Sequence, residues 1–126
     1  MVKAYNTSTI NFNYILNHKD FTLALCSFLD EFKRSTDRYT MIEYPPPSEG
    51  VNRETLCLLA AVTHKLANDF GVAVPDWVHE PFYVMPYPVF AHNTQNKEYQ
   101  DFLIQDAPPE FASKNIFHSS RAIGRV

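Results

Sequence analysis

Apolar residues recur with the period of an α-helix from about Asp20 to Arg34, and this stretch predicts the first amphipathic helix of the chain. Its apolar positions are Phe21, Leu25, Phe28, Leu29 and Phe32. Asp20 can accept a hydrogen bond from an amide of the first turn, and Lys33 and Arg34 suit the negative carbonyl end. Local signals therefore specify both ends of this helix.

A second helical pattern runs from about Arg53 to Phe70, and it is the most strongly specified element of the sequence. Asn52 can cap its start, and Gly71 supplies a residue that adopts the left-handed conformation at its end. The small residues Ala60 and Ala67 predict close approach of a partner helix. One stripe of this helix holds Leu56, Leu59, Ala60, Thr63, Leu66, Ala67 and Phe70.

The segments before and between these helices are less regular. In residues 1–19 the apolar positions fit either a short helix or an extended arm that packs on the same core; they are Ile10, Phe12, Tyr14, Ile15 and Leu16. The three prolines of 45–47 predict a stiff, non-helical connection. A short extended pairing of residues 41–44 is the main β-strand expectation.

Residues 72–126 alternate prolines and aromatic rings with short helical patterns. We expect 72–90 to wrap the two helices, since prolines interrupt any regular period there. A helical pattern returns over Lys97–Gln105 and restarts at 107–111, where Pro108 or Pro109 suits a first turn. Asn115 can end this piece in the left-handed conformation. Ser119 could cap a last turn through Arg121 and Ile123.

These patterns together predict a mostly α-helical, compact fold with long proline- and aromatic-rich connecting segments. We expect one domain over residues 1–126, since 126 residues and 14.5 kDa suit a single core. Within it, 1–19 form an arm or short helix, 20–71 carry the two main helices, and 72–126 supply the aromatic wrap and short C-terminal helices.

Composition and charge exclude several classes of protein. The net charge of −3 provides no basic field for nucleic acid, so direct nucleic-acid binding is not expected. The longest apolar run, Leu56–Val62, is far shorter than the roughly 20 residues of a membrane span. Residues 1–10 contain no apolar signal segment, so we expect a cytoplasmic protein.

The reactive residue types form no recognisable catalytic or metal-binding motif. Cys57 and His64 lie on one helix stripe, but two turns separate them by about 10 Å, too far for a thiolate–imidazole pair. The five histidines show no metal-ligand spacing, and neither Cys26 nor Cys57 belongs to a CxxC motif. Three glycines stand too far apart for a phosphate cradle. We therefore expect no catalytic residue, no metal site, no cofactor and two buried, reduced thiols.

Aromatic density is the least ordinary feature of the chain. The rings of residues 72–90, which we call the aromatic segment, could complete the core, or part of them could form an exposed docking surface, since interface centres are enriched in aromatic residues. We hypothesise that they contact a protein partner. The candidate contact residues are Trp77, Phe82, Tyr83, Tyr87 and Phe90, with Phe117 nearby.

A series of short motifs in the second half resembles a little-characterised bacterial domain. They are Leu59-Ala60-Ala61 with Leu66-Ala67, Gly71-Val72, Pro75-Asp76-Trp77, Ala107-Pro108-Pro109-Glu110-Phe111, Asn115-Ile116-Phe117 and the final Arg125-Val126. The resemblance covers roughly Tyr39 to Val126. Related domains also occur as the C-terminal part of Xre-type helix-turn-helix regulators.

The resemblance implies a regulatory or interaction role, for example in a toxin–antitoxin-like or mobile-element operon, and supplies no catalytic residue. Asn115 stands where the family usually has glycine, and Gly124 replaces a typical glutamate. No helix-turn-helix region precedes the similarity here, so DNA binding is not expected to carry over. We interpret the chain as a non-enzymatic bacterial interaction or regulatory module. The alternatives are an antitoxin-like protein that neutralises a co-encoded toxin, and a small enzyme without a recognisable motif.

Overall fold

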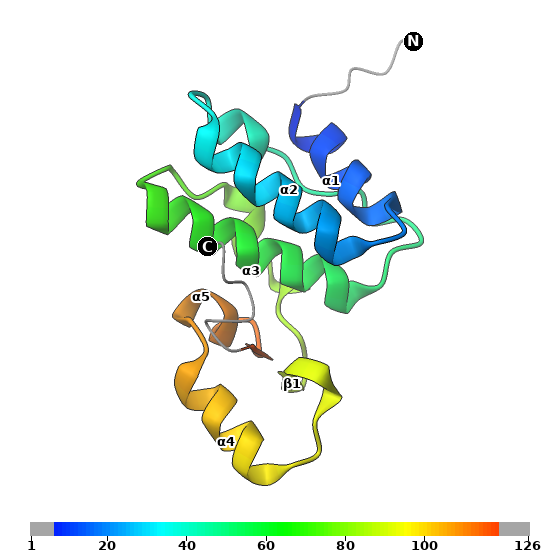
Figure 1. The fold of residues 1–126 in the computed structure, drawn as a ribbon, viewed down its shortest axis with the longest axis vertical. Coiled ribbons are helices and arrows are strands. Elements are labelled where there is room, and N and C mark those ends of the chain that lie inside the picture. The colour runs from blue at the N-terminus through cyan, green and yellow to red at the C-terminus, as the bar shows by residue number, and fades with distance from the viewer. Residues whose placement is uncertain (1–6, 119–126) are drawn as a thin grey trace.

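The protein is mostly α-helical, as predicted, in a computed structural model that describes residues 7–118 (Figure 1). Its α-helices are α1 (Thr7–Asn17), α2 (Phe21–Arg34), α3 (Arg53–Phe70), α4 (Lys97–Asp106) and α5 (Pro109–Ala112). Four short 3-10 helices connect them: η1 (Tyr39–Met41), η2 (Asp76–His79), η3 (Pro81–Tyr83) and η4 (Ala91–Asn93). Two short strands, β1 (Val89–Phe90) and β2 (Ile116–Phe117), pair in parallel.

Helices α2 and α3 confirm the two main sequence predictions, together with their capping residues. The Asp20 carboxylate accepts a hydrogen bond of 3.0 Å from the amide of Leu23. The Asn52 side chain accepts one of 2.8 Å from the amide of Glu54. Gly71 ends α3 with a φ of 66°, which is the left-handed conformation predicted for it.

Residues 7–17 form a helix, which settles the choice left open between a helix and an extended arm. Phe12 and Ile15 of α1 are buried in the core. The buried Ser8 hydroxyl donates to the carbonyl oxygen of Tyr44 at 2.6 Å and accepts from the amide of Tyr44 at 3.2 Å. This exchange ties α1 to the segment that follows η1.

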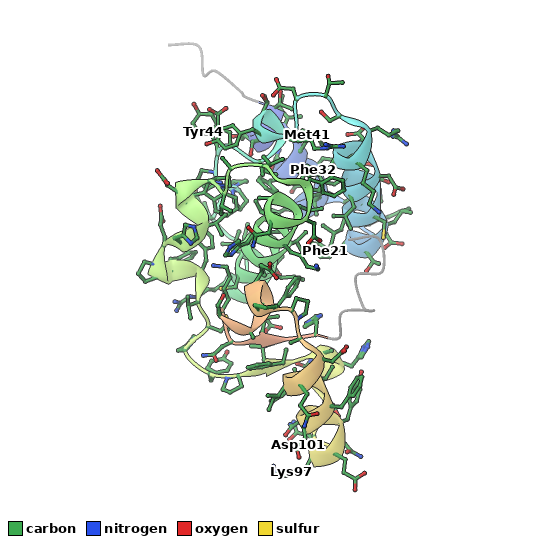
Figure 2. All side chains as sticks on the ribbon, turned by 90° about the vertical axis from the view of Figure 1, so that its left-hand side faces the viewer. Phe21, Phe32, Met41, Tyr44, Lys97 and Asp101 are labelled. Carbon is green, nitrogen blue, oxygen red and sulfur yellow. The ribbon has the colours of Figure 1, made fainter. Side chains whose placement is uncertain are left out.

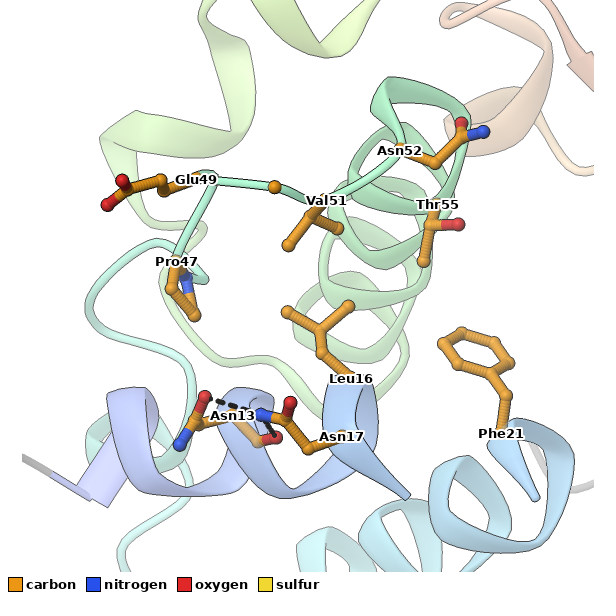
Figure 3. A pocket seen from close by; sticks show the side chains of 10 residues that line it. Asn13, Leu16, Asn17, Phe21, Pro47, Glu49, Val51, Asn52 and Thr55 are labelled. Carbon is orange, nitrogen blue, oxygen red and sulfur yellow. Dashed lines mark hydrogen bonds between the residues drawn. The ribbon is translucent and has the colours of Figure 1, made fainter. Parts of the chain in front are cut away.

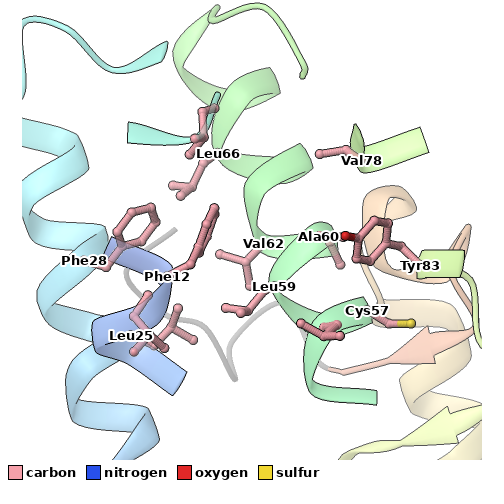
Figure 4. Close-up of a cluster of buried hydrophobic side chains, with 14 of the residues drawn as sticks. Phe12, Leu25, Phe28, Cys57, Leu59, Ala60, Val62, Leu66, Val78 and Tyr83 are labelled. Atoms are coloured by element: carbon pink, nitrogen blue, oxygen red, sulfur yellow. The ribbon is translucent and has the colours of Figure 1, made fainter. Parts of the chain in front are cut away.

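The core lies between the hairpin formed by α1 and α2 on one side and α3 on the other (Figure 4). Phe12 reaches between the two long helices and packs against Phe28, with ring centroids 5.8 Å apart. On the opposite side of α3, Ala60 faces Tyr83 (Figure 4). The neighbours of α3 on this side are the short elements η2, η3 and α5, so the α-helix that α3 meets here is the four-residue α5.

The β structure lies elsewhere than the sequence suggested. Residues 39–41 form η1, and the buried Ile42 follows it, so the extended pairing predicted for 41–44 is wrong. Within residues 7–118 the one sheet pairs Val89 with Ile116 and Phe90 with Phe117. Asn115, in the predicted left-handed conformation at φ 62°, precedes β2.

Helix α4 stands away from the bundle of α1, α2 and α3 (Figures 1 and 2). Asn96 caps it by accepting a hydrogen bond of 3.0 Å from the amide of Tyr99, and Pro109 occupies the first turn of α5 as predicted. The predictions for Ser119, Arg121 and Ile123 fall outside the described residues. None of the described helices is long and apolar enough to cross a membrane.

Candidate interaction surfaces

The six aromatic residues predicted as contacts divide between core and surface, and two of them are core residues. Trp77 and Tyr83 are 5% and 4% exposed, with ring centroids 5.2 Å apart. The Trp77 indole nitrogen donates a hydrogen bond of 3.0 Å to the carbonyl oxygen of Ile42. Both rings fill space beside α3, so their inclusion in an exposed contact surface is corrected.

The other four predicted contact residues reach solvent to different extents. Phe82 is 44% exposed and Tyr87 is 58% exposed. The Arg53 guanidinium lies over the Phe82 ring, 5.2 Å from its centroid. Phe90 and Phe117 are half-buried and stack at 5.5 Å across the β1–β2 pair. These four therefore remain candidate contact residues.

Helix α4 carries an exposed apolar surface that sequence reasoning missed. Tyr99 and Phe102 stack with their ring centroids 6.2 Å apart and their planes 11° apart. Phe102 and Ile104 are about half exposed, whereas Leu103 is fully buried. We call the stacked pair of Tyr99 and Phe102 the α4 surface. The sequence contained a signal for exposed apolar residues on this helix. Ile104 lies off the stripe formed by residues 99, 102 and 103, so these four side chains cannot all face the core.

A groove with a volume of about 330 Å³ lies between α1 and α2. Its lining includes the buried residues Ile15, Ala24 and Phe28, and also Ile10 and Tyr14, which are 55% and 56% exposed. The sequence placed Ile10 and Tyr14 among the candidate core positions. They lie outside the core because one helical stripe of α1 buries Ser8, Phe12 and Ile15 instead.

A second, more polar hollow of about 490 Å³ lies between the C-terminal end of α1 and the start of α3 (Figure 3). Leu16 and Val51 line it together with Asn13 and Asn17. The Asn17 side-chain amide donates hydrogen bonds of 2.8 Å to the side-chain and backbone oxygens of Asn13. These asparagines are thus engaged with each other across one turn of α1.

The two cysteines are free and occupy different environments. Cys57 is fully buried, whereas Cys26 is half-exposed, which corrects the prediction of two buried thiols. The Cys57 thiol lies 3.7 Å from the carbonyl oxygen of Phe82, to which it donates. Burial raises the pKa of this thiol, despite the opposing effect of Arg53. Cys57 therefore remains protonated and unsuited to nucleophilic attack.

His64, in the C-terminal half of α3, lies against His79 of η2. The two rings meet edge to face, with their centroids 5.3 Å apart. Burial, and then the neighbouring His79, lower the pKa of His64. Its Nδ1 is buried and has no hydrogen-bond partner among the described residues. The neutral imidazole is consequently the favoured state of His64.

Lys114 joins the C-terminal part of the chain to η2. Its ammonium group is buried and donates a hydrogen bond of 2.6 Å to the carbonyl oxygen of Val78. Burial lowers the pKa of Lys114. Over residues 7–118, no three His, Cys, Asp or Glu side chains come together in an arrangement that could hold a metal ion.

Comparisons with protein families, with curated proteins and with solved structures gave no match for this chain.

Proposed function

We propose that this chain is a non-enzymatic protein-interaction module that binds a partner through the α4 surface. The observation that carries the proposal is the stacked, exposed pair of Tyr99 and Phe102. Scattered apolar residues are normal on a protein surface, but adjacent aromatic rings are typical of the centre of an interface. An occupant would remove both rings from water together.

The position of α4 supports this proposal. Helix α4 packs on β2, where Phe117 stacks on Phe90. The buried Leu103 anchors the helix and leaves Tyr99, Phe102 and Ile104 toward solvent. A partner that covers α4 therefore approaches a helix that is already held in place, which reduces the entropy lost on binding.

A regulatory role, the context that the resemblance implies, agrees with a surface of this kind. In this interpretation the protein acts by binding to a partner protein, and its own side chains catalyse no reaction. The antitoxin-like alternative requires in addition that the partner be a co-encoded toxin, so deleting this gene alone would then be toxic.

The test is affinity purification of the tagged full chain from its native host, followed by mass spectrometry. We expect a protein that is retained by the wild type and lost from the double variant Tyr99→Ser/Phe102→Ser. The control is Tyr44→Ser, since Tyr44 is also exposed, at 47%, but follows η1. Equal recovery of the partner by the double variant would contradict an interaction through α4.

A further inference from the structure

We propose that the groove between α1 and α2 binds an amphipathic helix of a partner protein, with a basic side chain of that helix placed against Glu31. This site is separate from the α4 surface and does not depend on it. The groove has the shape for a helix, α1 carries no charge along it, and one acidic residue lies on its α2 side.

The shape of the groove suits a helix. Ile10 and Tyr14 are four residues apart and form one rim, and both are more than half exposed. Along α2, the lining positions are Ala24, Ser27, Phe28 and Glu31, which repeat at the spacing of one helix face. Two neighbouring helices that present such ridges form a groove into which the apolar side of a third helix packs.

The depth of the groove provides room for apolar anchor residues. Its lining includes the core residues Ile15 and Phe28, so an inserted side chain would contact the core of the protein directly. A volume of about 330 Å³ exceeds the space that one large side chain requires. We therefore expect two or three anchors from successive turns of the bound helix.

The charge pattern indicates what kind of helix would bind. Helix α1 contains no charged side chain from Thr7 to Asn17, and charged residues are depleted at the centres of protein interfaces. Glu31 is exposed and lines the groove on the α2 side. Its carboxylate makes no ion pair with any other described residue. The groove thus combines apolar residues and the uncharged polar residues Asn11 and Ser27 with one negative charge, which complements a lysine or arginine on the partner helix.

The same charge pattern argues against helix α4 of a second copy as the occupant. Of the four long helices in residues 7–118, α4 buries the fewest side chains, and its charged residues are Lys97, Glu98, Asp101 and Asp106. Three of these four are acidic, and Asp101 already pairs with Lys97 at 3.5 Å. Helix α4 would bring negative charge toward Glu31, which disfavours its binding in the groove.

The experiment is selection from a displayed library of amphipathic helices against the full chain. The library fixes apolar residues at positions i, i+3, i+4 and i+7 and varies the positions that flank them. We expect the selected helices to carry lysine or arginine at one constant position. In fluorescence polarisation, exchanging that residue for glutamate should weaken binding up to about fivefold, and Glu31→Lys should reverse this preference.

Matched surface variants locate the binding site. Ile10→Ser/Tyr14→Ser should reduce the affinity by about tenfold or more, since it removes the rim that contacts the anchors. Leu23→Ser should leave it unchanged, because Leu23 is 57% exposed on α2 but does not line the groove. Tyr99→Ser/Phe102→Ser should also leave it unchanged, which separates this site from the α4 surface.

Several results would overturn the proposal. One is recovery of no helices, and another is recovery of helices that bind the Ile10→Ser/Tyr14→Ser variant as tightly as the wild type. Helices without a constant basic position, or without a response to Glu31→Lys, would contradict the role of Glu31. Concentration-dependent self-association in sedimentation experiments, abolished by Ile10→Ser/Tyr14→Ser, would identify a second copy as the occupant and also overturn it.

Discussion

Single residues have the largest effect on the stability of this protein where a polar atom is buried. The Trp77 indole nitrogen and the Lys114 ammonium each donate to a backbone carbonyl oxygen about 35 residues away along the chain. The His64 Nδ1, by contrast, is buried without a hydrogen-bond partner in the part of the chain that the structure describes. A buried donor or acceptor that loses its partner costs about 1–3 kcal/mol, so these sites are sensitive to substitution and to protonation.

Protonation of His64 should destabilise the folded protein below about pH 6.5. Burial and the neighbouring His79 lower the pKa of His64 from its ordinary value of 6.5. As the pH falls through that value, the unfolded chain takes up a proton before the folded chain does, so the free energy of unfolding decreases. Above pH 6.5 the imidazole is neutral in both the folded and the unfolded chain, so His64 does not reduce the free energy of unfolding there.

The measurement is urea unfolding of the wild type and of His64→Asn between pH 5 and pH 7.5. We expect the variant to lose less stability on acidification than the wild type. Some pH dependence should persist, because burial also lowers the pKa of His118. An unchanged dependence in His64→Asn would show that this imidazole does not couple folding to pH.

At the scale of the elements, local capping defines the long helices, and tertiary contacts hold the short ones. Asp20, Asn52 and Gly71 satisfy the ends of α2 and α3 within their own neighbourhoods. Helix α5, with four residues, is too short to be stable alone and depends on its contacts with α3 and β2. Helix α4 lies between these cases, since it has a cap but a single fully buried side chain, Leu103.

Replacing the glycine at the end of α3 should destabilise the protein through the backbone alone. Gly71 has φ 66°, and a Cβ built on it meets no side chain or backbone from elsewhere in the described fold within 4 Å. We expect Gly71→Ala to lower the free energy of unfolding by roughly 1–2 kcal/mol because of the left-handed conformation. Gly71→Asn should cost less, since asparagine tolerates that conformation. Equal losses in the two variants, measured by urea unfolding, would contradict a purely conformational cause.

Removing the anchor of α4 should loosen that helix without loosening α3. Leu103→Ala deletes a fully buried side chain, a change that typically costs about 2–5 kcal/mol. Because α4 stands away from the bundle, we expect the loss as local opening, with faster amide hydrogen exchange over residues 97–106. Phe102→Ala is the control, since Phe102 is half exposed. Equal acceleration over residues 53–70 would instead indicate that α4 and α3 unfold together.

At the scale of the whole molecule, one cluster of buried apolar side chains connects the parts of the fold. It extends from Phe12 of α1 to Ile116 of β2 and includes Trp77, Tyr83 and Met85 of the aromatic segment. Cys57 belongs to this cluster, whereas Cys26 does not. The two thiols therefore report on different degrees of unfolding.

Thiol labelling should consequently show two separate phases. With Ellman's reagent under native conditions, we expect Cys26 to react readily and Cys57 to react at the rate at which the core opens, because Cys57 is fully buried and burial raises its pKa. Cys26→Ser should remove the fast phase, and Cys57→Ser the slow one. Reaction of both thiols at one rate in native buffer would show that the core opens more easily than its packing implies.

The sequence was informative where the determining interactions are local. The caps of α2 and α3, the left-handed Asn115 and the proline at the start of α5 depend on residues only a few positions apart, and each was predictable. The candidate surfaces were only partly predictable. Phe82 and Tyr87 were identified and are exposed, but Trp77 and Tyr83 carry the same compositional signal and are buried.

The amino-acid sequence by itself determined a mostly helical fold and the bounds of its two long helices, because periodicity and capping act over one or two turns of chain. The tertiary structure alone decided that residues 7–17 form a helix, that 89–90 pair with 116–117, and which aromatic rings face solvent. Those outcomes depend on contacts between residues that are far apart in the sequence. A side chain's exposure is fixed by what packs against it, and residue type and spacing do not specify that neighbour.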